Sequence, residues 1–209
     1  MRKIATVIAA LACMTTMAQD IKLPAPQKNQ KSTSVVQALD KRHSVREYSK
    51  KELSNQELSN LCWAACGVSR DAEHRTAPTA MNKKEIRLYV MTSKATYEYL
   101  AKENILKEIV KGDNRKVLAG GQNFVLDAPV SLVMVIDFGL FGSQNDHAKL
   151  MTAVDAGIVS ENINLYCQSV GLCTVPRGTM DAAAFKKLLK LNDNQLPILN
   201  NPVGYPKGK

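Results

Sequence analysis

The first residues in this chain whose types and spacing could do chemistry are Arg42, Ser44 and Arg46, in the stretch KRHSVREYSKKELSNQEL. No hydrophobic period runs through this basic cluster, so burial does not explain it. Two guanidinium forks and a hydroxyl can give a phosphate group bidentate, charge-assisted hydrogen bonds and a neutral one. The alternative is a helix end whose arginines are solvated, and the cluster taken alone favours that alternative.

Two predicted helices flank the basic cluster. Residues 34–40 have helical apolar spacing with Ser34 as N-cap, and this helix ends at the cluster. Ser54 and Glu57 form a capping-box pattern that opens a second helix, which Gly67 closes. The basic residues are therefore expected in a connection between two helices.

The rest of the chain predicts an α+β domain. A continuous apolar run over residues 128–137 indicates a strand buried on both faces, and residues 147–170 carry the longest helical pattern, with Gly171 as its stop. The remaining predicted elements are strands over residues 85–93, 172–176 and in the C-terminal tail, and helices over residues 104–110 and after Asp181.

Length and composition limit the class of protein. With 209 residues and 45% hydrophobic content, the chain suits one medium-sized domain with a sizeable core. The net charge of +9 could attract anionic partners, but the lysines are scattered and aromatic residues make up only 5%. Because no basic and aromatic side chains alternate along a stripe, we expect no nucleic-acid partner.

The N-terminus has the pattern of a secretory signal. Arg2 and Lys3 precede an apolar run over residues 4–14, and Thr16-Met17-Ala18 is a small-x-small cleavage site. This predicts a signal peptide over residues 1–18, a flexible linker over 19–33 and a domain over 34–209, in a periplasmic or secreted protein. Without the signal the protein would be cytoplasmic. The apolar run falls short of the roughly 20 residues of a bilayer span, so no membrane span is expected.

The cysteines do not predict a metal site or a disulfide. Beyond Cys13, the chain has Cys62, Cys66, Cys167 and Cys173. Cys62 and Cys66 lie one turn apart on a predicted helix, which is poor geometry for a bridge. No Cys/His ligand spacing is present, so we expect no metal and four cysteines packed as small apolar side chains.

Four segments in order resemble a known family. KRHSVREYSKKELS resembles the opening Arg-Arg/His-Ser-x-Arg-x-Phe/Tyr segment of the nitroreductase family of flavoproteins. RTAPTAMNKKEIRLYV is similar to that family's Pro-Ser-x-x-Asn loop and strand, and DAGIVSENINLYCQSVGLCTV to its long helix and Gly-Leu strand. PILNNPVGYPKGK resembles its closing Val-Gly-Tyr-Pro segment. The resemblance covers about residues 35–209.

The resemblance implies an FMN enzyme with a nitroreductase-like fold. Its central sheet is mostly antiparallel with flanking helices, and two chains form an interlocked homodimer with flavin sites at the interface. Arg42 and Ser44 would hold the FMN phosphate, His43 would lie beside the ribityl chain, and Arg46 near the flavin N1/C2 edge. The other implied cofactor-binding residues are Pro78, Thr79, Ala80 and Asn82 from the partner subunit, Arg177 and Gly178 near flavin N5, and Lys207 and Lys209 near the phosphate.

The implied activity is hydride transfer through flavin N5 in a ping-pong scheme. A reduced donor, NAD(P)H or another, would supply the hydride, and a small organic acceptor such as a nitro compound or quinone would receive it. No side-chain nucleophile or base is assigned. An exported enzyme would meet little NAD(P)H, so the donor stays open. The alternative function is a periplasmic flavin- or ligand-binding module with the same fold and no turnover.

Two departures from the family pattern bear on the substrate. Lys83, Lys84 and Glu85 follow the loop asparagine where relatives have Gln-Pro-Trp, at the rim of the substrate pocket. Relatives of the bacterial nitro-compound-reducing type have a Glu-Gly pair where this chain has Arg177-Gly178, and a cationic residue there would favour an anionic substrate or a different flavin potential.

A segment of small residues on the long helix predicts the seam of the dimer. Ala156, Gly157 and Ser160 lie on nearby turns, where small side chains permit close helix contact. Asp155 and Glu161 on the same helix are candidates either to orient arginines or to be solvated.

Overall fold

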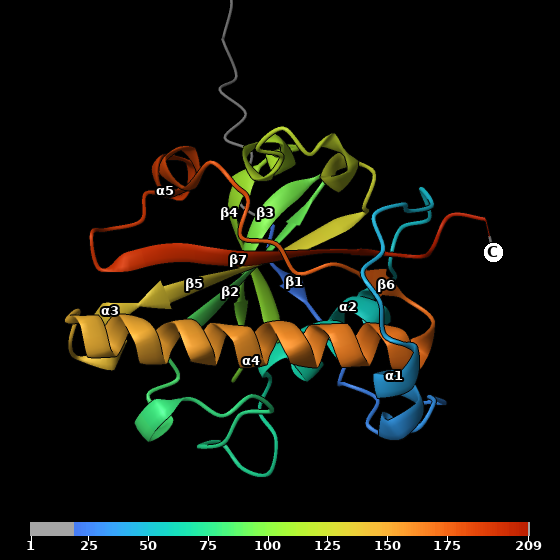
Figure 1. Cartoon of the computed structure of the whole chain (residues 1–209), viewed down its shortest axis with the longest axis horizontal. Helices are drawn as coiled ribbons and strands as arrows, with labels where there is room; N and C mark the ends of the chain where they lie inside the picture. The colour runs from blue at the N-terminus through green and yellow to red at the C-terminus, as the bar shows by residue number, and fades with distance from the viewer. Residues whose placement is uncertain (1–18, 209) are drawn as a thin grey trace, which may run out of the picture.

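The computed structural model of the chain describes residues 19–208. The predicted signal peptide and Lys209 lie outside these residues. A seven-stranded sheet forms the centre of the domain, in the order β1-β4-β3-β2-β5-β7-β6, and every strand pairing is antiparallel (Figure 1). The strands are β1 Ile21–Lys22, β2 Ile86–Thr92, β3 Ala95–Leu100, β4 Ile105–Lys111, β5 Val130–Asp137, β6 Cys173–Thr174 and β7 Gln195–Gly204.

The sheet is built around β5. All eight residues of this strand are buried, and it pairs with β2 on one side and β7 on the other. A strand covered on both faces has no polar face to show, which explains the uninterrupted apolar run predicted at this position.

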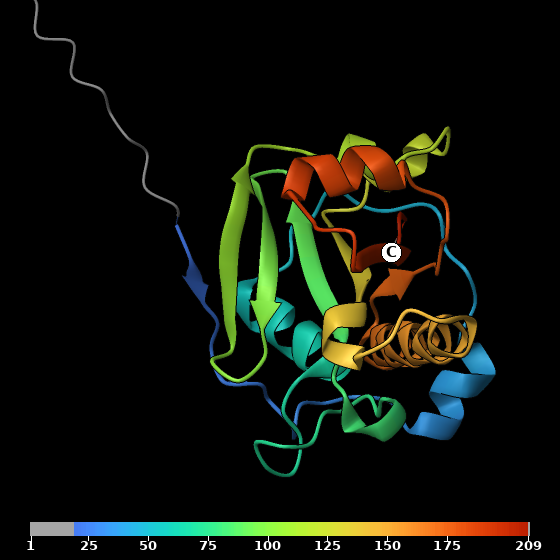
Figure 2. The same cartoon turned by 90° about the vertical axis from the view of Figure 1, so that its left-hand side faces the viewer.

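Helices cover both faces of the sheet (Figure 2). On one face, α2 and α4 pack against the sheet through residues such as Leu61 and Ile163. On the other, α5 and the short η2 segment pack through Phe185 and Leu118. The helical elements are α1 Val35–Lys41, α2 Asn55–Cys66, η1 Ala80–Asn82, η2 Arg115–Leu118, η3 Asn123–Leu126, α3 Phe138–Phe141, α4 Asp146–Val170 and α5 Ala182–Leu189.

The predicted helix ends are confirmed by their caps. Ser34 and Ser54 each accept a hydrogen bond from the backbone three residues on, and both capping boxes are complete. Gly171 ends α4 in the left-handed conformation, with φ of 79°. Asp181 caps α5 by accepting from the amide of Ala184. Gly67 ends α2 too, although its backbone is extended rather than left-handed.

The helix predicted over residues 104–110 is wrong, because this segment is strand β4. Its apolar residues come in adjacent pairs, Ile105-Leu106 and Ile109-Val110, a spacing that fits one face of a helix. In the fold, Asn104 has a φ of 53° and closes a hairpin in which β4 pairs with β3. β-Branched residues and the available sheet edge override the helical spacing.

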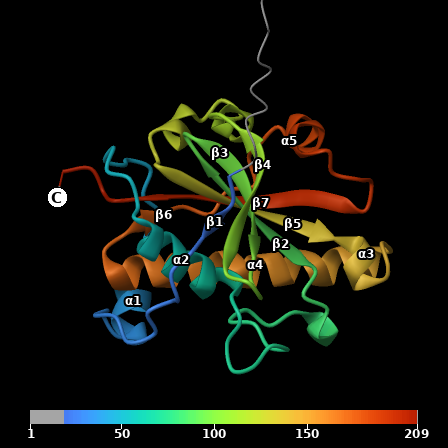
Figure 3. The same ribbon diagram turned by 180° about the vertical axis from the view of Figure 1, so that it is seen from behind.

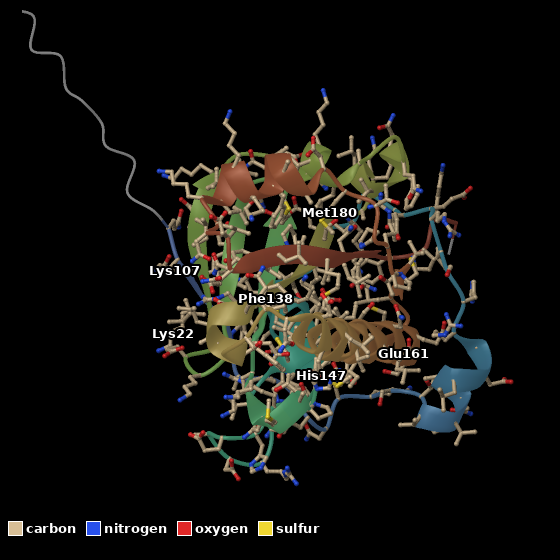
Figure 4. The ribbon with its side chains drawn as sticks, turned by 60° about the vertical axis from the view of Figure 1, so that its left-hand side comes forward. Lys22, Lys107, Phe138, His147, Glu161 and Met180 are labelled. Atoms are coloured by element: carbon tan, nitrogen blue, oxygen red, sulfur yellow. The ribbon has the colours of Figure 1, made fainter. Side chains whose placement is uncertain are left out.

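The prediction of a flexible linker over residues 19–33 is also wrong, because this segment packs against the domain. Strand β1 pairs with β4 at the edge of the sheet. Figure 3 shows this pair from the side opposite to that of Figure 1. Lys22 and Lys107, on these two strands, lie at the same edge (Figure 4). Farther along, the Gln27 amide donates to Asn60 Oδ1 at 2.8 Å, and Gln30 Nε2 lies 2.9 Å from the hydroxyl of Tyr166. The segment is a strap that crosses the edge strand, α2 and α4.

Candidate functional site

The basic cluster lies in an extended segment between strand β6 and the C-terminal tail. After α1 ends at Lys41, the Val45 amide donates to the carbonyl of Thr174 at 3.1 Å. Tyr48 forms a bridge with Pro206, and the Ser49 amide donates to the carbonyl of Tyr205 at 2.8 Å. These contacts hold residues 42–46 at the C-terminal end of α4 (Figure 1).

Tyr48 anchors this segment in the core. Its hydroxyl donates to the carbonyl of Val45 at 2.8 Å and reaches that of Pro202 at 3.3 Å. Burial raises the pKa of Tyr48 far above its ordinary value, so the phenol stays neutral. A Cβ at Gly204 would lie 2.7 Å from Pro129 Cδ and 3.2 Å from the Tyr48 ring, so this close approach requires glycine.

The side chains of the cluster are exposed and available. Those of Arg42, Ser44 and Arg46 make no hydrogen bond or ion pair with any residue in the 19–208 range. His43 Nδ1 lies 2.9 Å from the carbonyl oxygen of Lys41, and the Lys207 amide donates to the carbonyl of Glu47 at 3.3 Å. The structure therefore brings the predicted residues of the cluster together with Lys207; Lys209 lies outside the described residues.

A pocket opens beside this cluster and contains no carboxylate. Its lining residues are Arg42, His43, Val45, Asn164, Cys167, Gln168, Gly171, Leu172, Cys173, Thr174 and Pro206. Unpaired guanidinium and hydroxyl donors next to an acid-free pocket are suited to an anionic group such as a phosphate.

Arg177 does not present its charge to a substrate. Its side chain is 6% exposed, and Nε donates to Gln122 Oε1 at 3.0 Å while Nη1 donates to Asn200 Oδ1 at 2.8 Å. Nη2 donates to the carbonyls of Leu118 and Ala119. The expectation of an anionic substrate favoured by Arg177 is wrong at this point, because the guanidinium is used inside the domain. Desolvation lowers the pKa of Arg177.

The backbone of Arg177 is fixed as firmly as its side chain. Its amide donates to the carbonyl of Asn200 at 2.9 Å, and the Asn200 amide donates back at 2.8 Å. Gly178 follows with open space around it, since a Cβ there would have the Ile198 carbonyl oxygen, 4.0 Å away, as its nearest neighbour. The Arg177–Gly178 peptide is thus a rigid, accessible backbone element.

A buried polar network links this peptide to the basic cluster. Asn201 Nδ2 donates to Asn164 Oδ1 at 3.1 Å and reaches Thr174 Oγ1 at 3.3 Å, while Ser160 donates to Asn201 Oδ1 at 2.8 Å. Asn201 adjoins Asn200, the partner of Arg177. Because buried polar groups need partners, these contacts fix α4, β6 and β7 relative to one another.

The loop over residues 78–82 lies elsewhere on the molecule. The Ala80 amide donates to Asp155 Oδ2 at 2.8 Å, Thr79 Oγ1 accepts from the Lys84 amide at 2.8 Å, and Asn82 Nδ2 donates to the carbonyl of Glu73. Pro78 is exposed. In Figure 1 the loop lies below the N-terminal half of α4, away from β6 and the tail.

The two groups of predicted site residues are well separated within one chain. Asp155, which holds the loop, and Gln168, which lines the pocket, are 13 positions apart on α4, or about 20 Å at 1.5 Å per residue. A single chain does not bring Pro78, Thr79, Ala80 and Asn82 to the basic cluster.

Comparison with known proteins identifies the family. Residues 39–205 match the family described as Nitroreductase family. A protein of Ralstonia eutropha whose crystal structure is titled as that of a nitroreductase superposes with a TM-score of 0.84 at 31% identity, covering 91% of this chain and 90% of that one. The chain belongs to the nitroreductase family.

Two curated relatives are similar in sequence. One, from Methanocaldococcus jannaschii and also named as a nitroreductase, is 28% identical over 179 residues, 79% of this chain and 88% of the relative. The other, an FMN reductase [NAD(P)H] of Bacillus subtilis, is 23% identical over 187 residues, and the match spans 66% of its length. The predicted family, α+β fold, FMN cofactor and flavin-dependent oxidoreductase class are confirmed.

The basic cluster of this family member fits FMN. The cofactor carries a phosphate, and Arg42, Ser44 and Arg46 offer donors that no described residue occupies. The pocket beside them has no carboxylate to repel that phosphate.

Within residues 19–208, no group of His, Cys, Asp and Glu could hold a metal ion, and no helix is long and apolar enough to cross a bilayer.

The cysteines of the pocket are not nucleophiles at neutral pH. Burial raises the pKa of Cys173 to about 11 and that of Cys167 well above its ordinary value. Cys62, Cys66, Cys167 and Cys173 are all free thiols. Their packing as small apolar side chains agrees with the prediction.

The sequence interpretation missed the buried polar residues that shape the site. Asp155 was expected to orient arginines or to be solvated, yet it is buried and holds the backbone of Ala80. The sequence analysis did not single out Asn164, Asn200 and Asn201. Asparagine is rarely buried, so three asparagines within a predicted helix and strand of the core could have indicated a buried polar network.

Proposed function

We propose that this protein catalyses hydride transfer from a reduced donor, NAD(P)H or another, to a small organic acceptor such as a nitro compound or a quinone. The observation that carries the proposal is the set of unpaired donors on Arg42, Ser44 and Arg46 beside an acid-free pocket. When bound, FMN supplies the centre that takes up and releases the hydride.

The chain's own residues bind and orient the cofactor. Arg42 and Ser44 hold the phosphate, with His43 alongside and Lys207 and Lys209 adding positive charge. Arg46 stabilises negative charge at the edge of the ring, and the fixed Arg177–Gly178 peptide offers backbone groups to it. No side chain of the pocket acts as a nucleophile, in keeping with the raised pKa of both its cysteines.

The working unit in this proposal is a homodimer in which the loop of residues 78–82 reaches the cofactor of the other chain. The separation of this loop from the basic cluster within one chain supports the arrangement. Exposed aliphatic side chains support it as well, and they lie on α1 (Val35, Val36, Leu39) and on the outer face of α4 (Leu150, Val154).

The predicted seam on α4 needs a correction in its residues. Ala156 and Ser160 are buried against the chain's own sheet, so they cannot contact a partner. Gly157 points away from this core, and a Cβ there would meet nothing within 4 Å. The outward line Leu150, Val154 and Gly157, spaced four and three residues apart, is the seam that we propose.

Export remains part of the proposal. The pattern of Arg2, Lys3 and Thr16-Met17-Ala18 supports a cleaved signal and a periplasmic or secreted enzyme. Intact mass of the protein from its native host is expected to give a mature start at Gln19; an uncleaved chain beginning at Met1 would refute export.

Spectroscopy with turnover tests the function. The purified protein is expected to show the absorbance bands of oxidised flavin, to bleach under anaerobic NADH, NADPH or a low-potential dye, and to recover on addition of a quinone or nitroarene. A protein that binds FMN but is neither bleached by any donor nor reoxidised by any acceptor would be a binding module. One that takes up no FMN would contradict both functions.

A further inference from the structure

Two acidic side chains lie buried together beneath the loop of residues 78–82. Glu85, immediately before β2, is 0% exposed, and neither of its carboxyl oxygens makes a well-formed hydrogen bond within residues 19–208, although its own amide and the Thr79 hydroxyl approach the carboxyl group. Asp155 on α4 is 5% exposed and lies within hydrogen-bonding reach of Glu85. A buried carboxyl group with such weak hydrogen bonding, in contact with a second acid, is rare, so this pair requires a physical explanation.

Asp155 is one of two anchors of the loop. Its Oδ2 accepts from the Ala80 amide at 2.8 Å, and the second anchor is the bond from the Lys84 amide to Thr79 Oγ1, also 2.8 Å. Between and beside these anchors, Met81, Asn82 and Lys84 have φ values of 54°, 53° and 56°. Non-glycine residues in the left-handed region are costly and persist only where surrounding contacts hold them.

No cation of the described chain neutralises the acid pair. The ammonium of Lys84 contacts Glu73 at 3.0 Å, and Arg87 contacts Asp137 at 2.6 Å and Glu98 at 2.7 Å. Asp137, at the end of β5, meets Glu85 through the backbone only, its amide donating to the Glu85 carbonyl at 2.9 Å. On α4, the titratable group facing Glu85 is Asp155.

Two buried carboxyl groups in contact cannot both be ionised at low cost, so one proton stays between them. Burial, together with the Asp155 carboxylate, raises the pKa of Glu85 to about 7. The protonated Glu85 then donates to Asp155, where two carboxylates would repel each other, and Asp155 Oδ2 remains free to accept from the Ala80 amide.

We propose that Glu85 and Asp155 form a proton-sharing pair that positions the loop of residues 79–84, so that the loop is ordered while the pair holds its proton and loosens when that proton passes to solvent. Glu85 is a positioning residue, because it acts through Asp155 and the Ala80 amide. The consequence for the cofactor rests on the proposed function, in which this loop completes the site of the partner subunit.

Hydrogen exchange of the FMN-free protein tests the pair without reference to the cofactor. Protection of amides in residues 79–84, corrected for base-catalysed exchange, is expected to fall as pH rises from 6 to 9. In Glu85→Gln, which retains a donor but cannot titrate, protection stays constant, and Glu103→Gln, an exposed control, behaves as wild type. Asp155→Asn removes the second acid and is also expected to abolish the fall in protection with rising pH. This variant provides the test if Glu85→Gln folds poorly. Constant protection in the wild type would overturn the proposal.

The affinity for FMN over the same pH range tests the role of the loop in the site. Loosening of the loop of residues 79–84 is expected to weaken the binding of FMN to the wild type about two- to tenfold between pH 6 and 8. The affinity of Glu85→Gln for FMN is expected to lack this decrease. If the loop loosens but affinity stays constant, the acid pair stands and its role in the cofactor site is refuted. If no FMN binds at any pH, the proposed function fails while the exchange result still decides the pair.

Discussion

At the scale of single residues, the chain uses its arginines in opposite ways. Arg42 and Arg46 are exposed with no partner among the described residues, whereas Arg177 is buried with four hydrogen bonds to neutral oxygens. The resemblance to the family identified all three as site residues but could not separate them, because the burial of Arg177 depends on Gln122 and Asn200, which are distant in the chain. A charge that faces a ligand and one that fixes a backbone look alike in sequence.

Arg177 is therefore expected to matter for folding. Arg177→Met removes the guanidinium and takes the Arg177 donor from Gln122 Oε1, Asn200 Oδ1 and the Leu118 carbonyl, which should cost about 2–5 kcal/mol of unfolding free energy. Arg177→Lys should recover little, since an ammonium cannot reproduce the planar fork. Denaturant unfolding measures this, with the exposed Lys187→Met as control. A loss as small as that of the control would contradict a structural role for Arg177.

At the scale of elements, prediction succeeded where the determinants are local. Both serine capping boxes, the Gly171 stop and the buried run of β5 are decided by residues within a turn or a strand of one another. It failed at β4, where the spacing of Ile105, Leu106, Ile109 and Val110 fits a helix and only pairing with β3 and β1 makes a strand. It failed at residues 19–33 for the same reason, because the sequence of this polar segment does not show that it pairs with the edge strand β4.

The outer face of α4 gives a prediction at this scale. Gly157→Leu should leave the fold of the single chain intact, because a Cβ at this position would meet nothing within 4 Å. If Leu150, Val154 and Gly157 form the dimer seam, overpacking there should cost about 1–3 kcal/mol per site and lower dimer and flavin content together. Light scattering and the flavin-to-protein ratio measure this, with Ala183→Leu on exposed α5 as control. A dimer that is unaffected, or a monomer with full FMN, would contradict the seam.

At the scale of the whole molecule, the buried acids make stability depend on pH in two opposite directions. Glu85 has a pKa raised to about 7, so the folded state retains a proton that the unfolded chain has already lost. Burial disfavours the ionised form of Asp137, but hydrogen bonds from Arg87 and Gln195 outweigh it and lower its pKa. The Asp137 contribution is present above the unfolded pKa and is lost as pH falls through the lower folded pKa.

The raised pKa of Glu85 predicts that the unfolding free energy falls as pH rises from about 4.5 to about 7 and then levels off. The shift corresponds to about 3 kcal/mol at most. Glu85→Gln should flatten this part of the curve, whereas Glu103→Gln should not. Denaturant unfolding of the two variants and the wild type between pH 4.5 and 8 measures the difference, and a wild-type curve that rises over this range would contradict the assignment.

The central claim is that Arg42 and Arg46 bind FMN, Arg42 at its phosphate and Arg46 at the edge of its ring, and titration of FMN-free protein tests it most directly. Losing one charge-assisted contact should cost about 1.5–3 kcal/mol, so Arg42→Ala and Arg46→Ala are each expected to bind FMN roughly ten- to hundredfold more weakly than wild type. Riboflavin, which lacks the phosphate, should bind wild type and Arg42→Ala alike, and Lys187→Ala should bind FMN as wild type does. Wild-type affinity for FMN in both arginine variants would contradict the claim.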